Sequence, residues 1–310
     1  VDCGQQLTAE PAVLDGRLWL AGGRGIFGIA GVDAEPQRYW MSQGGDAAEQ
    51  RLENPVYAPP TWQEGRVQIT TRDRLVLDVD PASGTVTRRG IPAETNLPVT
   101  VFHSSLIVDR TLDIIVDLEQ VVQALDRRSS TVVWTHARDG VDIVCRPVLH
   151  EGRLLLIYAD GSLVALDPDN GDLLLEDDIG EEVAAAWAMP DGIHAYAGTR
   201  WLRWDGDRLA AEPLPAIASA GAAGVLLSRE NRAYVHDGSA WQQVGVHREP
   251  LSAPPLQWQG HAVLASGAAI EILGPRPFSI VVDGYALAPC VLGEHLAIVG
   301  SDGRVRLYAP

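Results

Sequence analysis

A glycine-rich segment at residues 23–28, Gly-Arg-Gly-Ile-Phe-Gly, matches the G-x-G-x-x-G fingerprint of dinucleotide-binding proteins. In that chemistry, the loop leads into a helix whose N-terminal N–H groups hold the pyrophosphate. Here the segment lies between two β-type runs, residues 18–20 and residues 26–30. The pattern therefore predicts a glycine-rich hairpin turn and no nucleotide site.

Residues 167–172, Asp-Pro-Asp-Asn-Gly-Asp, resemble a calcium loop because oxygen-bearing side chains recur at alternate positions. A calcium loop of that type needs Gly in sixth place and Glu in twelfth. Here Gly171 is fifth and Asp178 is twelfth, so the segment is better explained as a turn between two strands.

Other residues that could perform chemistry are dispersed along the chain. The eight His residues form no H-E-x-x-H motif, and Cys3, Cys145 and Cys290 form no C-x-x-C pair. The chain has no G-x-S-x-G motif, so only folding could assemble a Ser-His-carboxylate triad. We therefore predict no catalytic residue, no metal site and no cofactor.

The charge balance argues against several classes of partner. The chain has 24 basic residues, all of them Arg, against 41 acidic residues, and its formal net charge is −17. Nucleic-acid binding needs a basic surface, and an anionic membrane repels an acidic protein. No apolar run reaches the ~18 residues of a membrane span. We expect no nucleic-acid partner and no direct membrane insertion.

The sequence leaves the compartment open. No secretory signal is recognisable in the 310 residues, and this slightly favours the cytoplasm over the periplasm.

A repeated phrase organises the residues described so far. It consists of a short apolar run, a turn with Gly, an alternating strand, and often a second turn and strand. The first turn recurs every 32 to 49 residues. Its eight markers are Gly16, Gly65, Asp109, Gly152, Gly192, Gly224, Gly260 and Gly293.

Eight copies of a four-stranded unit predict an all-β fold. We expect an eight-bladed β-propeller of four-stranded antiparallel blades, with seven blades as the alternative, in a single domain of residues 1–310. Residues 112–125 have apolar residues at helical spacing, but the repeat register assigns them to two strands. A short helix is expected at residues 46–52.

The repeat copies resemble a known family. Val164, Ala165, Leu166 and Asp167, followed by Gly171, are similar to the pyrroloquinoline-quinone (PQQ) type of propeller repeat. Other similar segments are residues 124–126 followed by Trp134, residues 80–84 and residues 300–308. The family includes quinoprotein dehydrogenases as well as cofactor-free scaffold propellers of bacterial outer-membrane assembly. The resemblance therefore implies the fold much more strongly than a function.

Within that family, the chain is more similar to the scaffolds. Quinoprotein enzymes have adjacent cysteines over the cofactor and acidic metal ligands, and no two cysteines are adjacent here. We predict a noncatalytic protein-interaction scaffold, a module of a larger bacterial multiprotein assembly. The alternative is a ligand-binding or quinoprotein-like enzymatic propeller with its site at the central funnel.

Two further expectations concern the ends of the repeat array and its binding face. The last copy has only three strands, so residues 3–8 are expected to pair antiparallel with residues 304–308 and close the ring. The longest connections between blades are expected at residues 41–55, 88–98, 135–145 and 176–183. They carry many acidic residues, and loops carry binding. The candidate partner-binding residues, which would meet a basic patch, are Glu176, Asp177, Asp178, Glu181 and Glu182.

Overall fold

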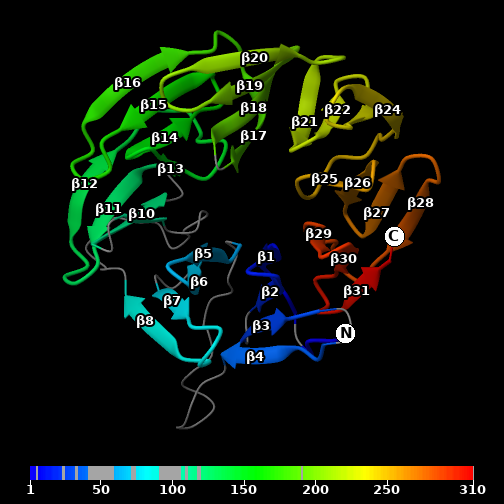
Figure 1. The fold of residues 1–310 in the computed structure, drawn as a ribbon, viewed down its shortest axis with the longest axis horizontal. Coiled ribbons are helices and arrows are strands. Elements are labelled where there is room, and N and C mark those ends of the chain that lie inside the picture. The colour runs from blue at the N-terminus through cyan, green and yellow to red at the C-terminus, as the bar shows by residue number, and fades with distance from the viewer. Residues whose placement is uncertain are drawn as a thin grey trace.

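The computed structural model describes residues 1–4, 6–22, 25–31, 34–40, 59–70, 75–90, 106–108, 111–116, 120–189 and 191–309. Its strands form eight antiparallel sheets that follow one another around a ring (Figure 1). Within these residues, seven sheets have four strands and the eighth has three. The prediction of an eight-bladed β-propeller is thus confirmed, and the seven-bladed alternative is wrong.

The first four blades use sixteen strands, numbered in chain order. Blade 1 contains β1 (Ala12–Leu14), β2 (Arg17–Gly22), β3 (Gly25–Ile29) and β4 (Gln37–Trp40). Blade 2 contains β5 (Thr61–Gln63), β6 (Arg66–Thr70), β7 (Leu75–Val79) and β8 (Val86–Gly90). Blade 3 contains β9 (Leu106–Val108), β10 (Leu112–Val116), β11 (Val122–Asp126) and β12 (Val132–His136). Blade 4 contains β13 (Val148–His150), β14 (Arg153–Ile157), β15 (Ser162–Leu166) and β16 (Leu173–Asp178).

The remaining strands follow the same order. Blade 5 contains β17 (Val183–Met189), β18 (Gly192–Ala197), β19 (Arg200–Trp204) and β20 (Leu209–Pro213). Blade 6 contains β21 (Ala218–Ala222), β22 (Val225–Ser228), β23 (Arg232–His236) and β24 (Trp241–Val246). Blade 7 contains β25 (Leu256–Trp258), β26 (His261–Ser266), β27 (Ala269–Leu273) and β28 (Phe278–Val281). Blade 8 contains β29 (Cys290–Leu292), β30 (His295–Val299) and β31 (Val305–Tyr308).

The strands have the burial that a propeller requires. First strands such as β1, β17 and β25 lie on the inner side of the ring in Figure 1, and fourth strands such as β16 and β28 lie on its outer side. The second and third strands of blade 4 are almost wholly buried, because each blade packs against both neighbours. The stretch with helical spacing forms β10 and β11, as the repeat register predicted. The helix expected at residues 46–52 lies outside the described residues.

The recurrent first turn is a tight hairpin with both central residues in the left-handed region. At residues 15–16, Asp15 has φ 48° and Gly16 has φ 68°. Residues 64–65, 151–152 and 259–260 repeat this geometry. A two-residue hairpin that follows the strand twist needs positive φ at both positions, and Gly adopts it without steric cost.

The turn between third and fourth strands is held by an aspartate. The Asp126 carboxylate accepts N–H hydrogen bonds from Arg128 (2.9 Å) and Ser129 (2.7 Å). These bonds, led by that from the Ser129 N–H, lower the pKa of Asp126. Backbone N–H bonds act in the same way on Asp80 and Asp205. The Asp of the repeat thus fixes a turn.

The ring closes at blade 8, where the N-terminal segment lies beside β31. Asp2 forms an antiparallel bridge with Arg304, the Val1 amine donates to the Val305 carbonyl, and the Cys3 N–H donates to the Gly303 carbonyl. The closure prediction holds for the partner blade, but the register differs. Residues 1–3 pair with residues 303–305, because Leu7 already bridges to Gly22 of blade 1.

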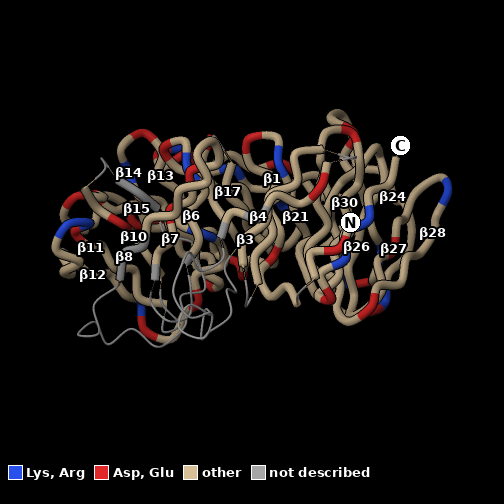
Figure 2. The backbone as a smooth tube through the Cα atoms, turned by 90° about the horizontal axis from the view of Figure 1, so that it is seen from below, with Lys and Arg blue, Asp and Glu red and all other residues tan. Residues whose placement is uncertain are grey.

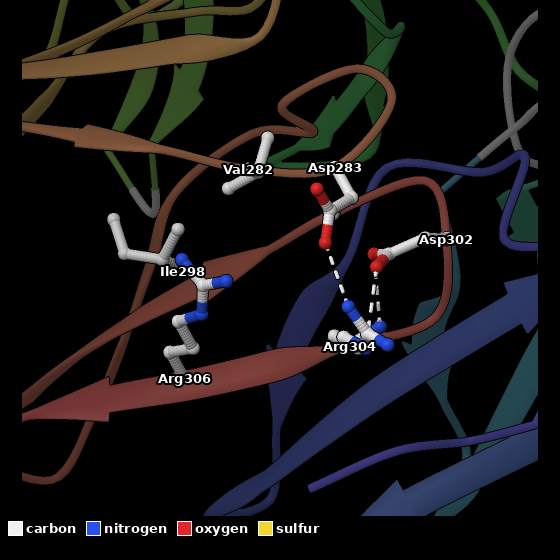
Figure 3. A pocket seen from close by; sticks show the side chains of 7 residues that line it. Val282, Asp283, Ile298, Asp302, Arg304 and Arg306 are labelled. Carbon is white, nitrogen blue, oxygen red and sulfur yellow. Dashed lines mark hydrogen bonds and ion pairs between the residues drawn. The ribbon is translucent and has the colours of Figure 1, made fainter.

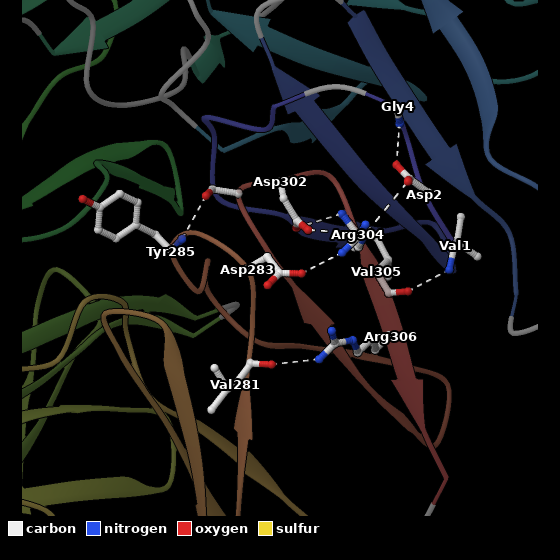
Figure 4. A network of polar contacts seen from close by, with 11 residues as sticks. Val1, Asp2, Gly4, Val281, Asp283, Tyr285, Asp302, Arg304, Val305 and Arg306 are labelled. Carbon is white, nitrogen blue, oxygen red and sulfur yellow. Dashed lines mark hydrogen bonds and ion pairs between the residues drawn. The ribbon is translucent and has the colours of Figure 1, made fainter.

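Polar contacts support this closure. Arg304 forms ion pairs with Asp2, Asp283 and Asp302, at 4.0, 2.6 and 3.6 Å (Figure 4). Arg304 and Arg306 line a small pocket between blades 7 and 8 (Figure 3). Arg306 donates to the Val281 carbonyl at 2.9 Å, so both cations are used in joining the last two blades.

Candidate interaction surface

The five candidate partner-binding residues lie where blade 4 leads into blade 5. Glu176, Asp177 and Asp178 belong to β16, the outer strand of blade 4. Glu181 and Glu182 lie in the short connection between β16 and β17. All five side chains are exposed. The sequence-based boundary of this connection needs correction, because the strand continues to Asp178 and only residues 179–182 form the loop.

Two of the five carboxylates are neutralised by arginines of the same protein. Arg138, which follows β12 in blade 3, contacts Glu176 at 2.8 Å and Asp160 at 3.7 Å. Arg200, at the start of β19, contacts Glu181 at 2.9 Å and also donates to the Ile179 carbonyl. Both pairs are partly open to water, so they mainly orient the side chains and contribute little stability.

The other three carboxylates have no ion pair within the described residues. The Asp177 carboxylate accepts the Asp178 N–H, and the Asp178 carboxylate accepts the Gly180 N–H. These bonds hold the two side chains in place at the end of β16. Asp177, Asp178 and Glu182 thus present net negative charge to the solvent at the junction of blades 4 and 5.

The other acidic connections expected from the sequence lie only partly within the described residues. Asp139 and Asp142 are exposed in the connection between blades 3 and 4. The acidic connections expected near residues 41–55 and 88–98 lie, apart from β8, outside the described residues. Asp and Glu occur on both faces of the ring in Figure 2. The blade 4–5 cluster is therefore one acidic region among several.

The other motifs considered from the sequence lie in turns and in the packed interior. Gly22 pairs with Gly25 across the hairpin of β2 and β3, so the G-x-G-x-x-G segment joins two strands. In the calcium-like segment, the Asp167 carboxylate accepts the Asp169 N–H, as in a turn. Burial raises the pKa of the thiols of Cys145 and Cys290 to about 12, which disfavours a reactive thiolate. No group of three potential metal ligands occurs among the described residues.

The described part of the chain includes no helix that could span a membrane.

Folding does assemble one Ser-His-carboxylate constellation. His247 Nδ1 lies 2.7 Å from Glu271 Oε2, and His247 Nε2 lies 2.9 Å from Ser266 Oγ. The His247 side chain has no exposed surface. His247 follows β24 of blade 6, whereas Ser266 and Glu271 belong to β26 and β27 of blade 7. The trio thus joins two blades, and no sequence motif could reveal it because its members lie on three separate segments.

The tryptophans also divide between two environments. Trp204 is 2% exposed and packs in the core between blades 4 and 5. Trp201 packs in an aromatic cluster between blades 5 and 6, with its ring 6.0 Å from Trp241 and 6.3 Å from Tyr196. The two residues therefore lie on opposite faces of β19.

Comparison with known proteins gives consistent matches. The sequence matches the family described as outer membrane protein assembly factor BamB over residues 94–189 and residues 118–310. A protein of that name from Alkalilimnicola ehrlichii is 34% identical over 95 residues, which are 30% of this chain and 24% of that protein. The crystal structure of BamB from Moraxella catarrhalis has a TM-score of 0.66 at 14% identity. That match covers 97% of this chain and 94% of the other and concerns the fold alone.

These matches correct one expectation and confirm another. The slight preference for the cytoplasm over the periplasm is wrong, because the matching family and relatives are described as outer membrane protein assembly factors. The resemblance to PQQ-type propeller repeats is confirmed. Because the family match extends over more than half of the sequence, this chain belongs to the PQQ-repeat β-propeller family described as outer membrane protein assembly factor BamB.

Proposed function

We propose that this chain is a noncatalytic protein-interaction scaffold in a bacterial multiprotein assembly that handles outer membrane proteins. Its membership of a family described by that role supports the proposal. Residues 1–310 act as a single propeller domain, in which packed blades hold the surface residues in fixed positions. The scaffold binds protein partners through its rim.

The observation that carries this proposal is the set of carboxylates at Asp177, Asp178 and Glu182, which form no ion pair with any described residue. A rigid acidic rim attracts a partner with a basic patch and speeds its association, and salt weakens the effect. The competing explanation is that the acidic surface only keeps the protein soluble. The two explanations differ in what neutralisation does to binding.

The test is capture of proteins from an extract of the native cell envelope by the immobilised chain. One variant replaces Glu176, Asp177, Asp178, Glu181 and Glu182 with their amides. A matched control replaces five exposed carboxylates elsewhere, Asp15, Glu35, Glu151, Glu249 and Glu294, in the same way. We expect the first variant to retain less partner, mainly through slower association, with an unchanged Tm. The proposal fails if the chain retains no protein specifically. If the two variants capture the same amount of partner, and capture is also the same at low and at physiological salt, the acidic residues between blades 4 and 5 are not the binding surface.

A further inference from the structure

The backbone of β16 is open along its outer side. β16 is the last strand of blade 4 and pairs only with β15. The Ile179 N–H donates to the carbonyl of Gly161, the residue directly opposite. Because hydrogen-bonded and non-bonded pairs alternate in an antiparallel ladder, the N–H and C=O of Glu176 and Asp178 point away from β15. The Asp178 N–H donates to the Asp177 carboxylate, whereas the Glu176 N–H has no hydrogen-bond partner among the described residues.

The first half of β16 is apolar and exposed. Leu173 is 53% exposed and Leu174 is 51% exposed. In the neighbouring outer strand β12, Val132 and Val133 occupy the equivalent positions at 38% and 50% exposure. Both strands have their register shift at this point. Two outer strands thus expose apolar side chains at equivalent positions. We call this surface the blade 3–4 rim, and it consists of Val132, Val133, Leu173 and Leu174.

Packing between the two blades keeps this rim together. The Trp134 indole of β12 donates to the Pro168 carbonyl at 3.0 Å and lies against Gly171, in the turn that precedes Leu173. Val133 directly precedes Trp134, and Leu173 lies two residues after Gly171. Because the contact between Trp134 and the turn at Gly171 fixes the starts of both strands, the blade 3–4 rim is already ordered, and a ligand need not pay the entropy of ordering it.

The second half of β16 is acidic. Leu173, Leu174 and Leu175 are followed by Glu176, Asp177 and Asp178, and none of the other six outer strands, β4, β8, β12, β20, β24 and β28, has consecutive acidic residues. An open strand edge, two exposed leucines and two carboxylates without an ion pair to any described residue, those of Asp177 and Asp178, therefore coincide on one strand. These features match one kind of ligand: an extended chain with adjoining apolar and basic residues.

We propose that β16 is a strand-addition site, where a partner protein adds an extended segment whose apolar residues cover the blade 3–4 rim and whose basic residues face Glu176, Asp177 and Asp178. This inference rests on the proposed scaffold function and specifies the chemistry of its partner. A second copy of this chain does not fit. Twofold antiparallel pairing of β16 with itself must match outward-facing residues, so it would place Glu176 opposite Glu176 and Leu174 opposite Asp178, which brings like charges together and forms no ion pair between the strands.

The first experiment measures binding of a short synthetic peptide, Thr-Arg-Thr-Arg-Thr-Val-Thr-Val-Thr, and of its reversed sequence, because either strand direction satisfies the proposal. A peptide with Glu in place of Arg is the control. We expect at least one Arg peptide to bind and the Glu peptide to bind about tenfold more weakly or worse. Hydrogen exchange should slow at the Glu176 amide when the peptide is bound. Equal binding of the Arg and Glu peptides would overturn the proposal, as would no binding of either Arg peptide.

Variants separate backbone pairing from charge. Glu176→Pro removes the outward N–H together with the carboxylate and its ion pair to Arg138, whereas Glu176→Gln keeps the N–H and removes only the charge and that ion pair. We expect the proline variant to lose about tenfold more affinity than the glutamine variant. Combined Leu173→Thr and Leu174→Thr should cost about tenfold. Val281→Thr, on the exposed outer strand β28, is the control and should change nothing. The Tm of each variant shows whether it is folded.

The outcomes also separate this inference from the scaffold function itself. If envelope proteins are still captured but neither Glu176→Pro nor the leucine variant affects capture or peptide binding, the scaffold function stands and β16 is not the site. If no protein is captured, the proposed function fails. Concentration-dependent dimers that vanish in the leucine variant would show that the rim binds a second copy and would overturn the proposed partner.

Discussion

Two junctions between neighbouring blades are both packed by an aromatic ring over a glycine, but the ring comes from a different strand of the repeat in each. At the junction of blades 3 and 4, Trp134 from a fourth strand lies against Gly171, where an added Cβ would be 2.8 Å from the indole. At the junction of blades 5 and 6, Tyr196 from a second strand lies against Gly221, where an added Cβ would be 2.4 Å from the ring. In both cases an aromatic ring of one blade fits over a glycine of the next.

The polar atom of each ring donates to a backbone carbonyl, so the difference between the junctions lies in the number of rings that surround it. The Trp134 N–H bonds to the Pro168 carbonyl, and the Tyr196 hydroxyl donates to the Ala222 carbonyl at 3.0 Å. Around Tyr196, however, the rings of Trp187, Trp201 and Trp241 lie 4.7, 6.3 and 6.0 Å away between ring centroids. The buried indole nitrogens of Trp187 and Trp201 have no hydrogen-bond partner among the described residues. Packing at the blade 5–6 junction is thus shared among several rings, whereas at the blade 3–4 junction it depends on one. The Trp of the repeat motif thus provides one way of joining blades, and the fold also accepts a junction formed by rings on other strands.

The largest effect should come from Trp134→Ala. The side chain is 8% exposed, and its removal leaves a cavity and an unpaired Pro168 carbonyl, so we expect a loss of about 3–5 kcal/mol in unfolding free energy. Chemical denaturation measures it. Trp201→Ala should cost less because neighbouring rings share its packing, and the exposed Trp62→Ala should cost least. Equal losses of unfolding free energy for Trp134→Ala and Trp201→Ala would show that the blade 3–4 junction depends on a single ring no more than the blade 5–6 junction does.

Gly221→Ala tests the other junction. The new Cβ would be 2.4 Å from Tyr196 and 2.6 Å from the Val225 carbonyl, so we expect a loss of about 1–3 kcal/mol. Adding Tyr196→Leu should recover part of that loss, because the smaller side chain leaves room for the methyl group. A double variant whose destabilisation is the sum of the single effects would show that the two residues do not compete for space.

His247→Leu tests the junction of blades 6 and 7. The buried imidazole bonds to both Glu271 and Ser266, and its replacement removes both contacts between the two blades. We expect a cost of about 1–3 kcal/mol by thermal or chemical denaturation. Ser266→Ala should cost less, since the His247–Glu271 contact remains. A Leu variant as stable as the parent would show that the trio contributes nothing to joining the blades.

These junctions also show how much the sequence could predict. The turns were predictable because local chemistry fixes them: Asp15 and Gly16 adopt positive φ in a hairpin, and Asp126 caps the turn that follows. Local chemistry and the repeat period together determine the number of blades. The fit of Tyr196 over Gly221 was not predictable, because it depends on the rotation of one blade relative to the next. The same holds for the three segments that meet at His247.

For the candidate surface, sequence predicted the acidic residues but not their pairing. Glu176 and Glu181 are neutralised by Arg138 and Arg200, which lie far away in the chain and approach only through folding. The connection expected at residues 176–183 also placed Glu176 in a loop, and acidic residues are in general depleted in strands. An outer strand with one side in water tolerates them. The exposed edge of β16 therefore became visible only with the sheet pairing.

The smallest effect concerns the junction of blades 8 and 1, where Glu10 accepts the Ala288 N–H. Burial raises the pKa of Glu10 despite that bond. A carboxyl group with a higher pKa in the folded state binds more protons there than in the unfolded chain. Its contribution to stability therefore falls as pH rises from the unfolded value near ~4.3 through the folded pKa.

Glu10→Gln removes this titration while keeping an oxygen that accepts the Ala288 N–H. We expect a slightly higher Tm than the parent at neutral pH, and a difference that shrinks as pH falls through the folded pKa of Glu10. Thermal unfolding of both proteins over a pH series measures it, with the exposed Glu35→Gln as the control. A difference between variant and parent that is constant across the series would show that Glu10 does not titrate with folding. The closure of the ring would then depend on the hydrogen bond to Ala288 and not on the charge of Glu10.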